Sequence, residues 1–182
     1  MARWNLDTNH LDVGFAVKHL MVASVKGRFH GVEADIEIDE ERPEASSVVA
    51  RIETATLDTR AADRDAHLRS ADFFNSEQFP LMTFRSTEVR RKGASDFAIT
   101  GDLTIRDVTN PITLTGSIAG PIADPFGGRR AGIEVTGEID REAWGLTWNM
   151  GLEAGGVLVG KTVKIAIEGE IVQAVAQDEA AA

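Results

Sequence analysis

The stretch Val32-Glu33-Ala34-Asp35-Ile36-Glu37-Ile38 alternates apolar and acidic residues without interruption. Because successive side chains of a β-strand point to opposite faces, this pattern predicts a strand with one apolar face and one solvated face. The stretch Val163-Lys164-Ile165-Ala166-Ile167-Glu168 repeats the pattern near the end of the chain. An amphipathic helix would instead place apolar residues three and four positions apart, so both stretches indicate β-structure.

The same alternation recurs along most of the chain and predicts eight to nine strands. Turn signals rich in Gly, Pro, Asp and Ser separate them, as at residues 41–43, 92–96 and 124–128. Strands with one apolar and one polar face, arranged as successive hairpins, are typical of antiparallel sheets. About eight such strands form a sandwich or a barrel, so the predicted class is all-β. The other alternating segments lie at residues 13–17, 48–52, 81–89, 97–105, 112–118 and 133–139.

Two segments interrupt the alternation. The first, residues 58–75, contains Asp63-Arg64-Asp65-Ala66-His67-Leu68 and predicts a short helix with Thr59 or Asp63 as its N-cap. The second, residues 141–156, is rich in Trp and Gly. Neither segment has the composition of a linker, so residues 3–173 are predicted to form a single domain. Residues 174–182 are predicted to be a flexible C-terminal tail.

Composition limits the classes of partner. The chain has 182 residues, no cysteine and a net charge of −10. The negative charge argues against a nucleic-acid partner and against adsorption to anionic lipid. The lack of cysteine excludes disulfides, thiolate metal sites and a cysteine nucleophile. The N-terminus does not resemble a leader, and no apolar run is long enough to span a membrane. We therefore expect a cytoplasmic protein without stable membrane insertion.

Residues 155–162, with the sequence GGVLVGKT, match the phosphate-binding pattern G-x-x-x-x-G-K-[ST]. A working P-loop connects a buried strand to a helix whose N-terminus holds the phosphates. Here the following residues alternate as a strand, and the preceding segment is rich in Gly and Trp. We interpret the motif as a glycine-rich turn that opens the last strand, and we predict no cofactor.

Candidate catalytic and metal-binding groups are few. The four histidines, His10, His19, His30 and His67, do not follow a zinc-ligand spacing, and no G-x-S-x-G motif occurs. We therefore predict no metal site and no catalytic triad. The Arg64-Asp65-His67 group offers an acid and a base. A buried Asp65 would need a cationic or amide partner, for which Arg141 is a candidate. We favour a structural role for this group, fixing the short helix to neighbouring strands.

Several spaced motifs resemble the YceI-like family, and the resemblance extends from Trp4 to Ile171. Leu11 departs from the family pattern, in which a serine commonly follows the first histidine. The matching motifs are Asp7-Thr8-Asn9-His10, Phe15-Ala16-Val17-Lys18-His19-Leu20-Met21, Lys26-Gly27-Arg28-Phe29, Arg64-Asp65-Ala66-His67-Leu68, Asp72-Phe73-Phe74, Phe79-Pro80, Gly101-Asp102-Leu103-Thr104-Ile105-Arg106-Asp107-Val108-Thr109 and Arg141-Glu142-Ala143-Trp144-Gly145.

The resemblance implies a fold and a function. The implied fold is an extended, eight-stranded antiparallel lipocalin-like barrel with a short helical insertion around residues 63–74. The implied function is that of a non-catalytic carrier that sequesters a polyisoprenoid, such as a polyprenyl quinone precursor, or a similar long-chain lipid. The resemblance also implies a homodimer. Many family members are periplasmic, whereas this sequence shows no leader.

The inward-facing apolar residues are the candidate ligand-binding residues. Burying one five-carbon isoprene unit contributes about 3–4 kcal/mol, and association costs several kcal/mol, so a few units suffice for micromolar binding. The predicted channel-lining residues are Phe15, Val17, Phe29, Phe84, Leu103, Ile112, Leu114, Ile133, Val135, Trp144, Met150 and Ile165, with His19 at the polar head of the ligand.

Two alternatives stay open at this point. The first is an enzyme of lipid or quinone metabolism that uses the Arg64-Asp65-His67 group. The second is a filled barrel that acts through protein contacts. An eight-stranded barrel is just wide enough either to be filled by its own side chains or to enclose one small ligand, so strand number does not separate a filled barrel from a hollow one.

Overall fold

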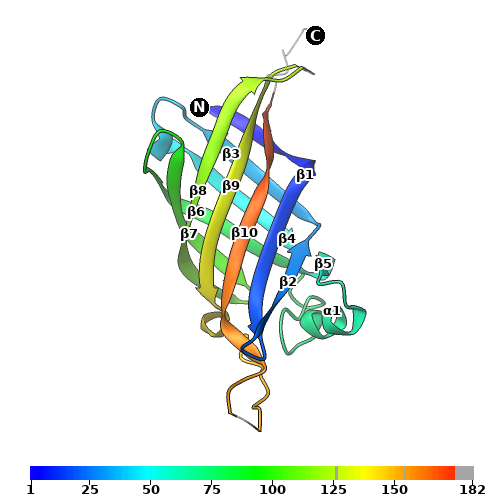
Figure 1. The fold of residues 1–182 in the computed structure, drawn as a ribbon. Coiled ribbons are helices and arrows are strands. Elements are labelled where there is room, and N and C mark those ends of the chain that lie inside the picture. Colours follow the sequence, from blue (N-terminus) through cyan, green and yellow to red (C-terminus); the bar gives the residue numbers. More distant parts are fainter. Residues whose placement is uncertain (126, 154, 175–182) are drawn as a thin grey trace.

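The computed structural model describes residues 1–125, 127–153 and 155–174. Within these ranges the chain forms ten strands, one α-helix and three short 3-10 helices (Figure 1). The C-terminal tail predicted for residues 174–182 lies, except for Ala174, outside the described residues. The strands are β1 (Ala2–His19), β2 (Ala23–Phe29), β3 (Val32–Ile38), β4 (Ser47–Glu53), β5 (Leu57–Asp58), β6 (Leu81–Arg91), β7 (Asp96–Ile105), β8 (Val108–Ala123), β9 (Arg129–Asp140) and β10 (Val159–Gln173).

The strands form one antiparallel sheet that closes into a barrel. The order is β10-β9-β8-β7-β6-β4-β3-β1, and β1 pairs again with β10 to close the ring. The first residues of β1 pair with β3 and its second half pairs with β2, so β2 and β3 share one position beside β1. In the same way β4 and β5 share the next position. The barrel therefore has eight strand positions, and the predicted all-β eight-stranded antiparallel barrel is confirmed.

The register explains the alternation in the sequence. In the β1–β10 pair, Val13 lies opposite Ile167 and Phe15 lies opposite Ile165, and these four side chains face the barrel interior. Ala166, between Ile165 and Ile167, and Lys164, just before them, are exposed on the outer face. Every second residue thus contributes to the interior, as a period of two requires.

The helical insertion is present but shorter than predicted. Helix α1 spans Ala62–Arg69, and turns continue the segment to Phe79. The predicted N-cap is wrong, because Ala61 occupies that position and no side chain caps the helix. Instead, the Asp65 carboxylate accepts hydrogen bonds from the Thr59 backbone N–H (2.9 Å) and hydroxyl (2.6 Å). This contact fixes the helix to the residue that follows β5.

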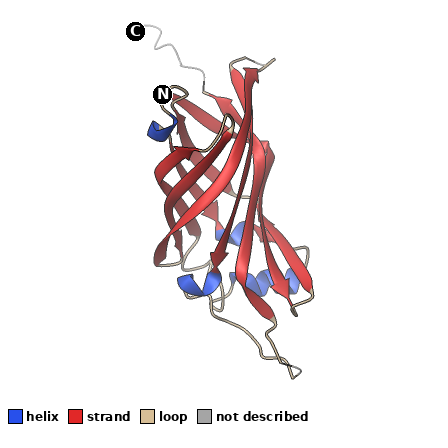
Figure 2. Ribbon diagram, turned by 60° about the vertical axis from the view of Figure 1, so that its left-hand side comes forward, coloured by secondary structure: helices blue, strands red, loops and turns tan. Residues whose placement is uncertain are grey.

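Buried side chains concentrate toward the two ends of the barrel. One cluster packs Trp4 against Ala131 and Ile171, where β1, β9 and β10 meet. A larger cluster includes Phe73, from the segment after α1, and Trp144, from the 3-10 helix Arg141–Trp144. Figure 2 shows that most helical segments lie at the end of the barrel away from the N-terminus. We call this the α1 end. None of the helices in the described ranges has the length and apolar character needed to cross a membrane.

Candidate functional site

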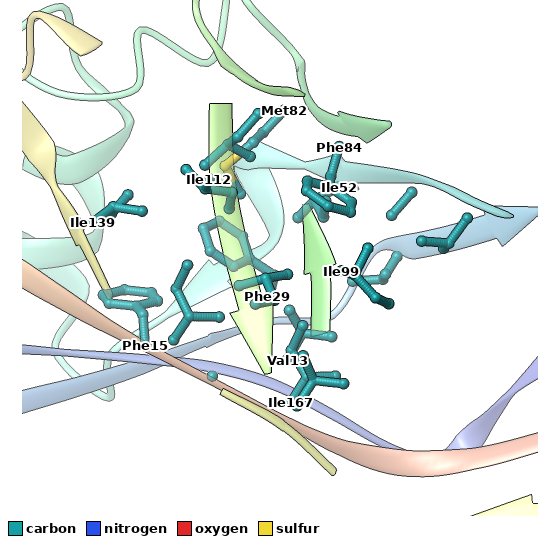
Figure 3. Close-up of a pocket in the computed structure, with 18 of the residues that line it drawn as sticks. Val13, Phe15, Phe29, Ile52, Met82, Phe84, Ile99, Ile112, Ile139 and Ile167 are labelled. Atoms are coloured by element: carbon teal, nitrogen blue, oxygen red, sulfur yellow. The ribbon is translucent and has the colours of Figure 1, made fainter. Parts of the chain in front are cut away.

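A cavity of about 800 Å³ lies inside the barrel. Its walls come from strands on all sides, together with α1 and the segment that follows it. Figure 3 shows part of this lining, where Phe15, Phe29, Met82 and Phe84 face a common space. The barrel is therefore hollow, and the alternative of a barrel filled by its own side chains is wrong.

Aromatic side chains shape the part of the cavity near α1. The ring centroids of Phe15 and Phe29 are 5.5 Å apart, and those of Phe29 and Phe74 are 5.7 Å apart in an edge-to-face arrangement. Offset and edge-to-face pairs at these distances are favourable. They connect the segment after α1 to β1 and β2 and give the cavity a well-packed aromatic wall.

Eleven of the thirteen residues predicted to bind a ligand line this cavity. The structure brings them together from β1, β2, β6, β7, β8, β9 and β10. These residues are Phe15, Val17, His19, Phe29, Phe84, Leu103, Ile112, Leu114, Ile133, Val135 and Ile165.

The other two predicted residues do not line the cavity. Trp144 is buried in the hydrophobic core, where its indole N–H donates a hydrogen bond to the Leu103 carbonyl (2.9 Å). Met150 is exposed on the loop before β10. Both residues belong to the non-alternating segment 141–156, where the period-two rule that correctly placed the strand residues does not apply.

Other lining residues were not among the predicted ligand-binding positions. Many follow from the same alternation, since Val13 shares a face with Phe15 and Ile167 shares one with Ile165. The alternation did not predict Trp148 as a lining residue, because Trp148 lies in the non-alternating segment 141–156. It lines the cavity near α1, and its ring lies 4.6 Å from that of His67 and 5.5 Å from that of Phe73, measured between centroids.

Charged and polar residues lie at the two ends of the cavity, and apolar residues line the length between them. One group lies at the α1 end, and the other lies near the β3–β4 and β6–β7 turns. The α1 end includes Lys18, His19, Asp63, Arg64, His67 and Arg141, and the other end includes Glu37, Asp39, Glu40, Ser46, Ser47, Arg91, Ser95 and Asp96. This arrangement suits a long apolar molecule whose polar group lies at one end.

The Arg64-Asp65-His67 group does not form one cluster. Arg64 donates to the Thr59 hydroxyl (2.7 Å) and carbonyl (2.8 Å), so Arg64 and the buried Asp65 both bind Thr59. His67 Nε2 lies 2.8 Å from an oxygen of Asp72 instead. Arg64 and Asp65 therefore anchor the helix as expected, and both do so through Thr59, which the sequence had suggested only as the N-cap of the helix.

Arg141 does not pair with Asp65, contrary to expectation. Its buried guanidinium donates to the carbonyls of Leu146, in the first part of the loop before β10, and of Gly160 (2.9 Å), at the start of β10. Burial lowers the pKa of the Arg141 guanidinium. Arg141 thus holds that loop closed through backbone acceptors.

The P-loop-like motif is a turn that leads into a strand. Gly155 and Gly156 have positive φ angles of 83° and 98°, and β10 begins at Val159. Lys161 lies in β10, and its Nζ is 2.7 Å from a carboxylate oxygen of Glu142, which raises the Lys161 pKa. No helix begins after the motif in the described residues, so the phosphate-binding arrangement is not formed.

An ionic cluster lies on the outer surface around Arg130. Its Nη1 is 2.6 Å from Asp7 and 2.5 Å from Glu170, and Nη2 is 2.9 Å from Asp124. The guanidinium, with a smaller contribution from His10, lowers the pKa of Asp7 to about 2. Asp7, His10 and Glu170 have metal-ligand chemistry and lie within 4.8 Å of one another. Arg130 already supplies the positive charge at this position, so the cluster is explained as an ion-pair network.

Comparisons with known proteins agree with this architecture. Residues 4–171 match the model of the YceI-like domain. The chain is 41% identical to Protein YceI of Escherichia coli O17:K52:H18 over 142 residues, which are 78% of this chain and 74% of that protein. It resembles the crystal structure of the Campylobacter jejuni YCEI protein, with 30% identity, a TM-score of 0.73 and coverage of 93% and 96%.

A polyisoprenoid binding domain from Saccharophagus degradans, implicated in plant cell wall breakdown, shares the fold at lower identity. The TM-score is 0.66, with 13% identity and coverage of 96% of this chain and all of that one. The family model matches nearly the whole barrel, and the sequence identity of 41% to the Escherichia coli protein extends over most of both chains. The chain therefore belongs to the YceI-like family.

Proposed function

We propose that this protein binds one polyisoprenoid, or a similar long-chain lipid, inside the barrel and carries it without chemical change. The observation that carries the proposal is the cavity of about 800 Å³, whose long apolar wall separates two polar ends. Ligand sites commonly enclose roughly 300–1,000 Å³. A cavity of this size and polarity fits a hydrocarbon chain better than a compact polar substrate.

The shape of the barrel favours an elongated ligand. Strands β8 and β10 contain 16 and 15 residues. At about 3.3 Å per residue, each spans roughly 50 Å along its length. Burial of each five-carbon unit contributes about 3–4 kcal/mol, so affinity grows with the number of units enclosed and needs no directed polar contact along the tail.

The position of polar groups supports a carrier rather than an enzyme. Arg64 and Asp65 are engaged with Thr59. Of the predicted group, Arg64 and His67 line the cavity, and His67, which lies 2.8 Å from Asp72, is the one not bound to Thr59. The rival is therefore an enzyme of lipid or quinone metabolism in which His67 acts as a base.

A cavity-filling substitution tests the proposal. Ala34 lines the cavity on β3, so Ala34→Trp would occupy ligand space. Ala16→Trp on β1 is the matched control, because Ala16 lies between the outward-facing Lys26 and Lys164 on the neighbouring strands. Native mass spectrometry on protein purified without detergent measures bound lipid and uptake of a polyprenyl probe. We expect wild type and Ala16→Trp to take up one chain and Ala34→Trp to lose uptake.

The opposite result would reject the proposal. A wild-type protein that carries no lipid and takes up no probe is not a lipid carrier, and equal uptake by Ala34→Trp would place the ligand outside the cavity. The homodimer and the cytoplasmic location expected above stay predictions, which sedimentation velocity and cell fractionation test.

A further inference from the structure

Exposed apolar side chains gather at the α1 end of the barrel. Of the seven large hydrophobic residues exposed in the described part of the chain, five lie there, and four of these form one contiguous group, while Leu81 begins β6. Leu20, Met21 and Val22 form the β1–β2 turn and are 41%, 64% and 81% exposed, and Met150 on the loop before β10 is 56% exposed. We call these four residues the apolar tip. Single exposed apolar residues are ordinary, whereas a contiguous group marks an interaction site.

Direct contacts join the two parts of the apolar tip. The Leu20 N–H donates to the Leu158 carbonyl (2.9 Å), and the Leu158 N–H donates to the Met150 carbonyl (2.9 Å). A Cβ built on Gly156 would lie 3.7 Å from Met21 Cγ, so Met21 rests against this loop. Figure 1 shows the β1–β2 turn and the loop before β10 side by side at the lower end, with the loop extending past the strands.

The β1–β2 turn has a conformation that its residues disfavour. Leu20 and Met21 have positive φ angles of 51° and 63°, and the Val22 N–H donates to the His19 carbonyl (3.2 Å). Two successive positions with positive φ in a hairpin turn favour residues such as Asn and Gly, because large side chains are strained there. Leu20 and Met21 bear this strain while exposed to solvent. The stability of the barrel therefore does not explain why Leu and Met occupy these two positions, whereas contact of their side chains with an apolar phase outside the barrel does.

Two lysines, Lys18 and Lys26, flank the apolar tip on β1 and β2, although the whole chain carries −10. Arg28 lies farther along β2 and is paired with Asp12 at 4.0 Å, so it does not count toward the charge of the apolar tip. The adjoining loop adds one exposed carboxylate, Glu153, so the local balance stays positive. The argument from net charge against anionic lipid thus does not hold at this end, because exposed charges act over about 10 Å or less in physiological salt. Apolar side chains flanked by lysines complement an anionic lipid surface.

The apolar tip lies beside one end of the cavity. Lys18 and His19, which immediately precede Leu20, line the cavity, and so does Leu158, which bonds to Leu20. A surface that receives the apolar tip would therefore lie against this end of the ligand channel. Ile122, which is 65% exposed, is at the end of β8, away from this end (Figure 1).

We propose that the apolar tip inserts into the surface of an anionic lipid bilayer and sets the α1 end of the cavity against it, so that lipid enters and leaves there. The exchange step rests on the proposed lipid-binding function, whereas docking itself does not require a loaded cavity. Leu20, Met21, Val22 and Met150 enter the interfacial region, and Lys18 and Lys26 face the anionic head groups.

Vesicle flotation with a matched pair of variants tests docking. The vesicles contain phosphatidylcholine and phosphatidylglycerol at about two to one, with pure phosphatidylcholine for comparison. The variant L20N/M21G removes two apolar side chains and installs the residues that the turn favours, so it should fold at least as well as wild type. The control I122N removes an equally exposed apolar side chain from the other end.

We expect wild type and I122N to float with anionic vesicles and L20N/M21G to bind at least about tenfold more weakly, since apolar side chains withdrawn from water supply much of such binding. Lys26→Ala should weaken binding to anionic vesicles about fivefold, and added salt should weaken it further. Three results would overturn docking: no flotation of wild type, equal loss in I122N, or a dimer in sedimentation velocity that L20N/M21G abolishes.

Uptake of a farnesyl-based fluorescent probe from vesicle-free solution separates docking from ligand binding. L20N/M21G should keep wild-type uptake there and lose rapid uptake from vesicles. If wild type takes up no probe in solution but floats, docking stands and the lipid-carrier function fails. If it takes up probe but does not float, the carrier function stands and docking fails.

Discussion

The hydroxyl of Thr59 donates a 2.6 Å hydrogen bond to the buried carboxylate of Asp65, and the Thr59 backbone N–H donates a second one at 2.9 Å. These bonds join the segment after β5 to helix α1. Leu68, on α1, and Phe73 and Phe74, just after it, line the cavity. The contact therefore supports one end of the ligand channel without touching its interior.

Removing the Asp65 carboxylate should destabilise the barrel. Asp65→Ala leaves the Thr59 N–H and the Thr59 hydroxyl hydrogen without an acceptor in a buried position, and we expect the free energy of unfolding to fall by about 2–3 kcal/mol. Thr59→Val should cost less, and the double variant should cost less than the two single variants together, because they share one interaction. Urea unfolding of all four proteins measures the coupling. Additive effects would show that the two residues act independently.

Asp7 should make stability depend on acidity. Its pKa falls from 3.8 to about 2 on folding because Arg130 hydrogen-bonds the carboxylate. A group whose pKa is lowered in the folded state stabilises it above the unfolded pKa, and the stabilisation disappears as pH falls through the folded pKa. We therefore expect Asp7→Asn to lower Tm above about pH 4, with the difference shrinking toward pH 2. Melting curves across this range measure it.

Glu33→Gln is the control for this pH dependence, because Glu33 is an exposed carboxylate on β3. It should leave the pH profile of Tm close to wild type. High salt should reduce the effect of Asp7→Asn only slightly, since the Arg130 and Asp7 side chains are 23% and 14% exposed and partly buried pairs are screened less than exposed ones. A difference in Tm that stays constant from pH 7 to pH 2 would contradict the role assigned to the Asp7–Arg130 pair.

Two tryptophans of the same segment should behave differently. Trp144→Phe removes the hydrogen bond to the Leu103 carbonyl in the hydrophobic core, so it should lower the free energy of unfolding by about 1–3 kcal/mol and leave lipid uptake unchanged. Trp148→Ala removes part of the cavity wall and should weaken uptake of a polyprenyl probe. Probe titration and urea unfolding of both variants check this. Reversed effects would mean that Trp144, not Trp148, contacts the ligand.

His67 separates the carrier from the enzyme. It pairs with Asp72 and stacks edge-on against Phe73 and Trp148. If His67 has only a structural role, His67→Ala should lower Tm. The mass of a bound polyprenyl probe should then stay unchanged over time in both wild type and the variant. The enzyme hypothesis requires that wild type alter the probe and that folded His67→Ala does not. Mass spectrometry of the extracted probe decides between them.

Local sequence predicted the strands well because strand direction is a local property. Phe15, Val17, Ile133 and Val135 each follow from a period of two, and all four reach the cavity. That rule does not extend to Trp144 and Met150, which do not line the cavity, because segment 141–156 is held by Arg141 and backbone turns instead of by strand pairing. The partners of Asp65 and Arg141 were also unpredictable, since hydrogen-bond partners depend on how separate segments pack.

The sequence by itself determined the all-β class, the inward face of most strands, the place of the short helix and, through its motifs, the family. Only the tertiary structure decided that β1 closes on β10, that the interior is hollow, and that the Leu20-to-Val22 turn meets the Met150 loop beside one end of the cavity. The physical reason is the separation along the chain of the residues that interact. Alternation requires only the geometry of neighbouring residues, whereas closure, cavity volume and a shared surface depend on segments that are far apart in the chain.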